Sequence, residues 1–327
     1  MIVRRLKLLS ILSLLWVSFC SAQADQFNKL QQLMRVAAAQ KNTDVDLIIF
    51  SYDRPLQLRA YLESLDKRMR GLNKTYVLYR ASDQLFAQAY DELIALYPTT
   101  NFVCQVVEPG AVANIKPQLS TIFEQSQASY FMFGVDDIVV TEEVDVQDCV
   151  RAMEYYGAYS FYLRLGKNIT QCYTLSVHED FANPPLQEVE KGIFMWTVDQ
   201  SPYDWNYPNS LDMSIFRKKE VRPVIAAIDY VTPNQLDAAW ARCIDPSWKG
   251  LCYEHSKMVN IPLNLVQETQ GMRNMQFFST KELLDDFLIG FKIDIDDLYK
   301  FNNNSPHMHY IPKFVYDDER MHLRIAK

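Results

Sequence analysis

Between residues 45 and 135, short apolar runs alternate with segments of helical spacing. The first run, "VDLIIF" from Val45 to Phe50, is almost continuously apolar, which predicts a strand that is covered on both faces. The alternation predicts βαβ units, and therefore an α/β fold in which helices flank a mostly parallel central sheet, as in Rossmann-like nucleotide-binding domains. The predicted strands are 45–50, 75–79, 101–107 and 130–135, and the predicted helices are 56–69, 83–97 and 116–126.

The alternation is less regular outside this region. A helix is expected at 26–40, and further helices are expected near 218–228, 233–243 and 280–289. No linker separates the two halves of the chain. We therefore expect one domain over residues 25–327, with a nucleotide-binding half at 25–150 and a second half at 151–327 that closes over the site.

Polar clusters follow three of the predicted strands. They are Ser51-Tyr52-Asp53-Arg54, Arg80 to Asp83, and Asp136-Asp137. Because ligands of open α/β sheets bind beyond the carboxyl ends of the strands, these clusters are expected on one rim.

Asp136 and Asp137 lie side by side in the apolar stretch "YFMFGVDDIVV". Two adjacent carboxylates repel each other unless a cation or hydrogen-bond donors lie between them, and Mg²⁺ and Mn²⁺ prefer oxygen ligands. The doublet therefore predicts a divalent cation site. The alternative is a turn or helix cap, a common place for an Asp after a strand.

Composition and charge exclude several classes of protein. The net charge of −7 and the lack of a Lys/Arg cluster beyond the first seven residues argue against binding to nucleic acid. No G-x-S-x-G, H-E-x-x-H, P-loop or G-x-G-x-x-G motif is present. Cys243 and Cys252 are close enough in sequence to form a disulfide.

The N-terminus has a different character. Basic residues precede an apolar run from Leu8 to Cys20, and Ala22-Gln23-Ala24 has the small-x-small pattern of a cleavage site. Residues 1–24 are thus expected to be a secretory signal peptide or, alternatively, a membrane anchor. Either places the body outside the cytosol, secreted, periplasmic or membrane-anchored.

The chain resembles glycosyltransferases of the GT-A fold, family 2 type. The resemblance rests on "SYDRP" at 51–55, "TYVLYRASD" at 75–83 and the strand that ends at the acidic doublet. Further segments look like a bacterial group of these proteins: "LRLGKNIT", "DWNYPNSLDMSIFR", "MVNIPLNLVQ" and "FLIGFKIDIDDL". The resemblance extends from about residue 45 to the C-terminal region.

The resemblance implies roles for particular residues. The end of the first strand, Ser51 to Arg54, contacts the nucleoside, and the last acid of an Asp-x-Asp motif binds Mn²⁺ or Mg²⁺ on the diphosphate. That triplet is not intact here: with Asp137 in the last place Val135 fills the first, and with Asp136 in the first place Ile138 fills the last.

We favour the first alignment, with Asp137 on the metal and Asp136 facing the ribose. His307 matches the C-terminal histidine that often supplies a further metal ligand, and at most one of His307 and His309 should reach the cation. Arg80 is expected to assist electrostatically, unless it forms an ordinary surface ion pair.

Residues 196–212 hold the expected acceptor side. Trp196, Trp205 and Tyr207 are candidates to stack on a sugar ring, although buried core positions are the alternative. Asp212 is the candidate general base, with Asp204 as the second choice.

Together these features predict a metal-dependent transfer of a sugar from a nucleoside diphosphate sugar to a hydroxyl-bearing glycan, lipid or protein. The alternative is a secreted carbohydrate-binding or interaction protein that keeps the fold without catalysis. Donor sugar, acceptor and stereochemical course stay open.

Overall fold

The computed structural model describes residues 42–107, 112–264 and 277–325. The predicted leader at 1–24 and the predicted helix at 26–40 lie outside these residues. In the described part of the chain, no helix combines the length and apolar character that a membrane crossing requires.

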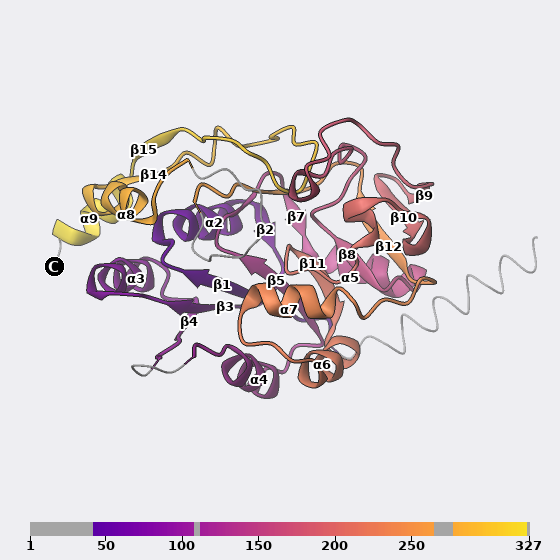
Figure 1. Ribbon diagram of the computed structural model, residues 1–327, viewed down its shortest axis with the longest axis horizontal. Coiled ribbons are helices and arrows are strands. Elements are labelled where there is room, and N and C mark those ends of the chain that lie inside the picture. The colour runs from indigo at the N-terminus through magenta and orange to yellow at the C-terminus, as the bar shows by residue number, and fades with distance from the viewer. Residues whose placement is uncertain (1–41, 108–111, 265–276, 326–327) are drawn as a thin grey trace, which may run out of the picture.

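One nine-stranded sheet runs through both halves of the chain (Figure 1). Its spatial order is β4 (Asn101–Cys104), β3 (Leu72–Arg80), β1 (Val45–Tyr52), β5 (Tyr130–Val135), β11 (Ser214–Arg217), β8 (Ser160–Tyr162), β12 (Lys249–Tyr253), β10 (Ile193–Thr197) and β9 (Gln187–Glu190).

The first four of these strands are parallel to one another, as predicted. β11 is antiparallel to both β5 and β8, and β10 is antiparallel to β12 and β9. The α/β fold class is therefore confirmed. The second half extends the same sheet with strands of three to five residues, which are too short to produce a recognisable period in the sequence.

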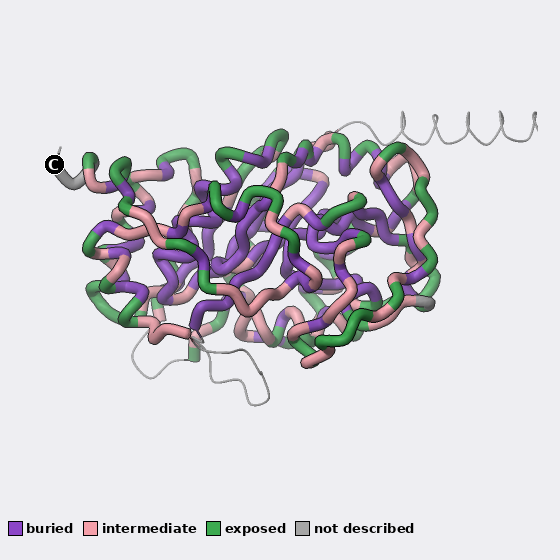
Figure 2. The backbone as a smooth tube through the Cα atoms, turned by 90° about the horizontal axis from the view of Figure 1, so that it is seen from above, coloured by how far each residue is buried: buried purple, intermediate pink, exposed green. Residues whose placement is uncertain are grey.

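Helices cover both faces of the sheet (Figure 1). On one face lie α2 (Pro55–Arg68), α3 (Gln84–Leu96), α5 (Val146–Tyr156) and α8 (Thr280–Ile289). On the other lie α4 (Lys116–Gln125), α6 (Lys218–Ala227) and α7 (Pro233–Trp240). The predicted helices of the two halves, other than the one at 26–40, are thus present. Because both faces are covered, every residue of β1 from Val45 to Ser51 is buried, and Figure 2 shows buried residues running through the middle of the molecule.

Smaller elements complete the fold. They are β2 (Met69–Arg70) with β7 (Val144–Asp145), β6 (Ile138–Val140) with β13 (Met258–Asn260), β14 (Phe291–Ile293) with β15 (Phe314–Tyr316), α9 (Asp318–Ile325), and the 3₁₀ turns η1 (Tyr173–Leu175), η2 (Val198–Gln200) and η3 (Tyr203–Asn206).

Cys243 and Cys252 are both free thiols, so the disulfide that their spacing allowed does not form. Cys252 lies within β12 and is buried, whereas Cys243 follows α7 on the other side of a loop.

Gly134 lets α2 approach β5 directly below the acidic doublet. A Cβ atom at this position would overlap the hydroxyl oxygen of Tyr61 and lie 2.9 Å from two carbons of its ring. Tyr61 is itself fully buried, and its hydroxyl has no hydrogen-bond partner among the described residues. Only glycine fits here without moving the helix or the strand.

We expect Gly134→Ala to lower the free energy of unfolding by about 1–3 kcal/mol, because overpacking forces side chains and backbone to shift. Urea denaturation measures the change. Adding Tyr61→Phe should recover part of the loss by removing the overlapping oxygen. An unchanged unfolding midpoint in Gly134→Ala would contradict the close approach.

Candidate functional site

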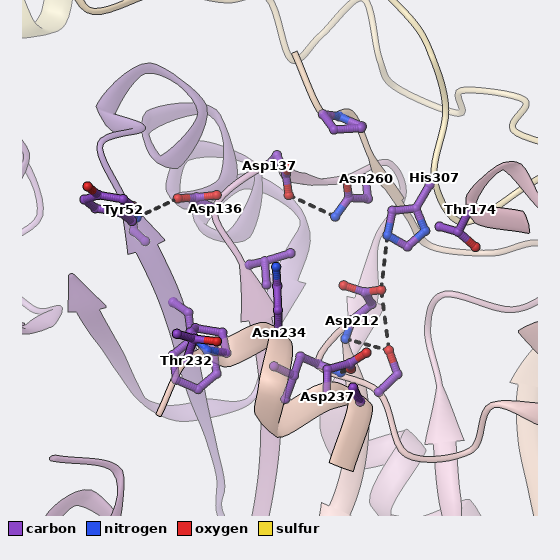
Figure 3. Close-up of a pocket in the computed structure, with 18 of the residues that line it drawn as sticks. Tyr52, Asp136, Asp137, Thr174, Asp212, Thr232, Asn234, Asp237, Asn260 and His307 are labelled. Atoms are coloured by element: carbon purple, nitrogen blue, oxygen red, sulfur yellow. Dashed lines mark hydrogen bonds and ion pairs between the residues drawn. The ribbon is translucent and has the colours of Figure 1, made fainter. Parts of the chain in front are cut away.

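A cavity of about 550 Å³ opens at the carboxyl ends of β1, β3 and β5. It brings together residues far apart in the sequence, including Tyr52, Asp136, Asp137, Asp212, Asp237, Asn260 and His307 (Figure 3). The two sequence halves thus meet at the rim where ligands of α/β sheets bind.

The acidic doublet lies in this cavity and is held by donors. Asp136 accepts hydrogen bonds from the Tyr52 backbone N–H at 3.0 Å and from Arg54 Nη1 at 3.0 Å. Asp137 accepts from the same Nη1 at 2.7 Å and from Asn260 Nδ2 at 2.9 Å. A single guanidinium therefore bridges the two carboxylates, a pairing that the sequence analysis did not foresee.

Arg54 is fixed on its other side by Asn264. Nε of Arg54 donates to Asn264 Oδ1 at 2.9 Å, Nη2 donates to the Asn264 carbonyl, and Gln57 Nε2 also donates to Oδ1. Burial raises the pKa of Asp136 to about 6, and Asp137 adds to the rise whereas Arg54 opposes it.

The nucleoside-side candidates are only partly in the cavity. Ser51, Tyr52 and Arg80 line it, and the Arg80 guanidinium lies 3.7 Å from the centre of the Tyr52 ring. Asp53 does not line the cavity, because its carboxylate accepts the Ser82 backbone N–H at 2.8 Å and so holds the turn after β3. The expected direct contact of Asp53 with the nucleoside is therefore not found; Asp53 instead stabilises the turn that follows β3.

Asp212 and His307 face each other across the cavity, with His307 Nε2 3.5 Å from Asp212 Oδ2 (Figure 3). Nδ1 of His307 is buried without a hydrogen-bond partner in the described part of the chain. His309 does not line the cavity and instead packs its ring against Tyr173.

Asp204 is tied to a residue that sequence reasoning missed. Arg164 Nη1 donates to Asp204 Oδ1 at 2.9 Å, and its Nη2 donates to the carbonyls of Asp204 and Tyr207. Arg164 lies only just after the short strand β8, so no sequence pattern marked it.

The two tryptophans are not at the cavity. Trp196 and Trp205 are 3% and 0% exposed and pack edge to face, with ring centroids 4.9 Å apart. Their indole N–H groups donate to the backbone carbonyls of Trp205 and Ile169. The prediction that these two rings stack on a sugar is therefore wrong, because both rings are buried in the core.

Two tyrosines line the cavity instead. Tyr207 is one of them, and its contact with a sugar stays a prediction. Tyr203 is 42% exposed, with its ring tilted against that of Phe181 at a centroid distance of 4.8 Å. The backbone of Tyr203 has φ of +48°, a conformation that a non-glycine residue adopts only when its surroundings hold it there.

The described residues contain no group of three or more His, Cys, Asp and Glu side chains arranged to hold a metal ion. Two buried polar atoms nevertheless lack partners among the described residues, namely Oδ1 of Asn260, whose amide donates to Asp137, and Nδ1 of His307, whose backbone pairs with that of Asn260. Each Asp137 oxygen accepts one protein hydrogen bond and keeps a second lone pair. Asp137 and His307 therefore fit an incomplete site, one whose further ligands come from a bound molecule.

No family model matches the chain. It is 28% identical over 301 residues to the "Bifunctional glycosyltransferase pgtA" of Dictyostelium discoideum, an alignment that covers 81% of this chain and 38% of the relative. The chain thus spans well under half of that protein. The resemblance to glycosyltransferases stated from the sequence is confirmed by this similarity.

Solved structures resemble the chain only distantly. S. aureus TarS 1-349 gives a TM-score of 0.43 at 12% identity, covering 66% of this chain and 59% of TarS 1-349. GalNAc-T7 with UDP, GalNAc and Mn2+ gives a TM-score of 0.44 at 9% identity, covering 79% of this chain and 50% of that one. Similarities this low add nothing to the geometry above.

Asp237 is a further cavity residue that the sequence analysis missed. It accepts hydrogen bonds from Tyr207 Oη at 2.6 Å and from the Leu211 backbone N–H at 3.0 Å. Burial, followed by the charge of Asp212, raises the pKa of Asp237 to about 6. Asp237 lies in the middle of α7, where nothing in the sequence sets it apart from an ordinary surface Asp.

This raised pKa predicts a pH-dependent stability. As the pH rises, the unfolded chain releases this proton first, so the contribution of Asp237 to the free energy of unfolding should fall by about 2–3 kcal/mol between about pH 4 and pH 6. Asp237→Asn should flatten the slope in that window, measured by urea denaturation at several pH values. Asp91→Asn on the exposed face of α3 is the control; an equal flattening in both variants would contradict the assignment.

Proposed function

We propose that the chain is a glycosyltransferase that moves a sugar from a nucleoside diphosphate sugar to a hydroxyl acceptor. The observation that carries the proposal is the cavity itself. It has an arginine-bridged acidic doublet at its centre, an aromatic and arginine pair on one side, and further carboxylates on the other. The similarity to a glycosyltransferase over 81% of the chain supports the same reading.

The donor would lie along the carboxyl ends of the parallel strands. Tyr52 and Arg80 offer a stacking surface for the nucleoside, and Asp136 lies next to Tyr52 in a position to accept from a ribose hydroxyl. The diphosphate would then reach Asp137 and Arg54, the groups at the centre of the cavity.

Asp137 and His307 would hold a Mn²⁺ or Mg²⁺ ion together with the donor phosphates. Such hard cations are commonly bound by one or two protein carboxylates plus substrate phosphates, which agrees with a protein site that is incomplete alone. When bound, the ion would neutralise charge that develops on the departing diphosphate.

Asp212 is the better candidate for the general base. Asp204 already forms a buried ion pair with Arg164, whereas Asp212 has no arginine or lysine partner among the described residues. Tyr207, Asp212 and Asp137 all line the cavity, and Asp212 interacts electrostatically with both of the others, so an acceptor hydroxyl held near Tyr207 would be close to Asp212.

The donor side is tested by calorimetry with UDP, GDP, CDP and ADP, in Mn²⁺ and in EDTA. We expect Mn²⁺ to strengthen binding of at least one nucleotide, and Asp137→Asn to remove at least about a tenfold gain, as the loss of metal-site residues typically does. Asp148→Asn, an exposed residue of α5, is the matched control. Binding of glycans without nucleotide affinity would favour a carbohydrate-binding protein instead.

The assignment of the base is tested by transfer kinetics. Asp212→Asn should reduce kcat by about two orders of magnitude with nucleotide affinity unchanged, since a general base contributes that much. Asp204→Asn should reduce kcat less. The reverse order of the two effects would assign the role to Asp204.

A further inference from the structure

Three side chains form a row across neighbouring strands at one end of the cavity. Tyr52 of β1 is the register partner of Arg80 of β3, and Gln105 directly follows β4, where its backbone N–H donates to the Tyr79 carbonyl at 2.7 Å. All three line the cavity. Sequence reasoning singled out the first two and missed Gln105, because the predicted strand 101–107 ran through it.

Gln105 is held in place but its amide lacks a partner. The residue is 7% exposed, and its Nε2 is buried with no hydrogen-bond acceptor in the described part of the chain. A buried donor without an acceptor is unfavourable, and in native proteins such groups usually receive a partner from water or a ligand. A ligand that brings an acceptor atom to this end of the cavity would satisfy the amide.

The surroundings of Gln105 suit a flat aromatic ligand. Phe50, Leu78 and Ile115 are nearly fully buried apolar residues at this end of the cavity, and the stacked pair of Arg80 and Tyr52 adds a planar face. The aspartates that line the cavity come from other elements, after β5 and from the second half of the chain.

The position of Gln105 matches the base of a donor whose diphosphate lies at the acidic doublet. In the sheet order β4, β3, β1, β5, Gln105 and Asp136 are three strand spacings apart, or about 14 Å. Tyr52 lies at the opposite side of the cavity from His307 (Figure 3).

We propose that Gln105 selects the nucleobase of the sugar donor by donating its Nε2–H to the carbonyl oxygen at C4 of uracil or C6 of guanine, so that the site takes such an oxo base over its amino counterpart. Cytosine carries an amino group at C4 and adenine carries one at C6, so the amide N–H of Gln105 would face another N–H group there. This inference rests on the proposed function, since it assumes that a nucleoside diphosphate occupies the cavity.

The test compares base pairs that differ at that group: UDP with CDP, and GDP with ADP, titrated with Mn²⁺ present. The wild-type chain should prefer one oxo base over its amino counterpart by about tenfold or more, the scale of one hydrogen bond with its desolvation. Gln105→Glu replaces the donor by an acceptor of the same size and should move that ratio toward the amino base by at least about tenfold. Gln125→Glu at the exposed end of α4 is the matched control.

A second variant guards against misfolding. Gln105→Met keeps the side-chain length without polar atoms and should abolish the preference while thermal unfolding stays at or above that of wild type. Wild-type chain that binds none of the four nucleotides would overturn the proposed function. Nucleotide binding with an unchanged base ratio in Gln105→Glu, or a wild-type preference for an amino base, would overturn the role of Gln105 alone.

Discussion

The bridge from Arg54 to Asp136 and Asp137 is the interaction on which the site depends. Two adjacent carboxylates buried at the end of an apolar strand would destabilise the fold if left unpaired. Arg54 comes from the end of β1 and is fixed by Asn264 on its other side. One guanidinium thus links the ends of β1 and β5 to the segment after β13, and all of these segments contribute to the wall of the cavity or support it.

The backbone around the cavity is held in unusual conformations. Of the five non-glycine residues with positive φ in the described chain, Asp53 and Met213 adjoin Arg54 and Asp212, Ser176 follows the lining residue Leu175, and Tyr203 is itself a lining residue. Such conformations cost free energy and persist where packing enforces them. Here these conformations occur beside side chains that line the cavity. The packing that enforces the backbone conformations therefore also positions those side chains.

Much of the first half of the fold could be predicted, because its helices and the strands β1, β3 and β5 are long enough to show their own periods. The rim residues followed from parallel topology alone. Arg164, Asp237 and Asn260 could not be found this way, since their place in the cavity comes from contacts between distant segments, whereas Gln105 was missed because the predicted strand 101–107 extended past the end of β4. The positions of Trp196 and Trp205 were predicted wrongly for a related reason: the sequence shows that a residue is aromatic, but not whether its ring is buried in the core or exposed at a binding surface.

The charges of the cavity bear on how a donor can enter it. Five aspartates and three arginines line it, which leaves two net negative charges when every aspartate is ionised and His307 is neutral. A nucleoside diphosphate adds further negative charge, so added cations should favour its binding. Burial raises the pKa of Asp237 to about 6, so this carboxylate adds its negative charge at neutral pH, where an external cation would offset the charge of a bound diphosphate. We infer that donor and divalent cation bind together, each making the site more favourable for the other.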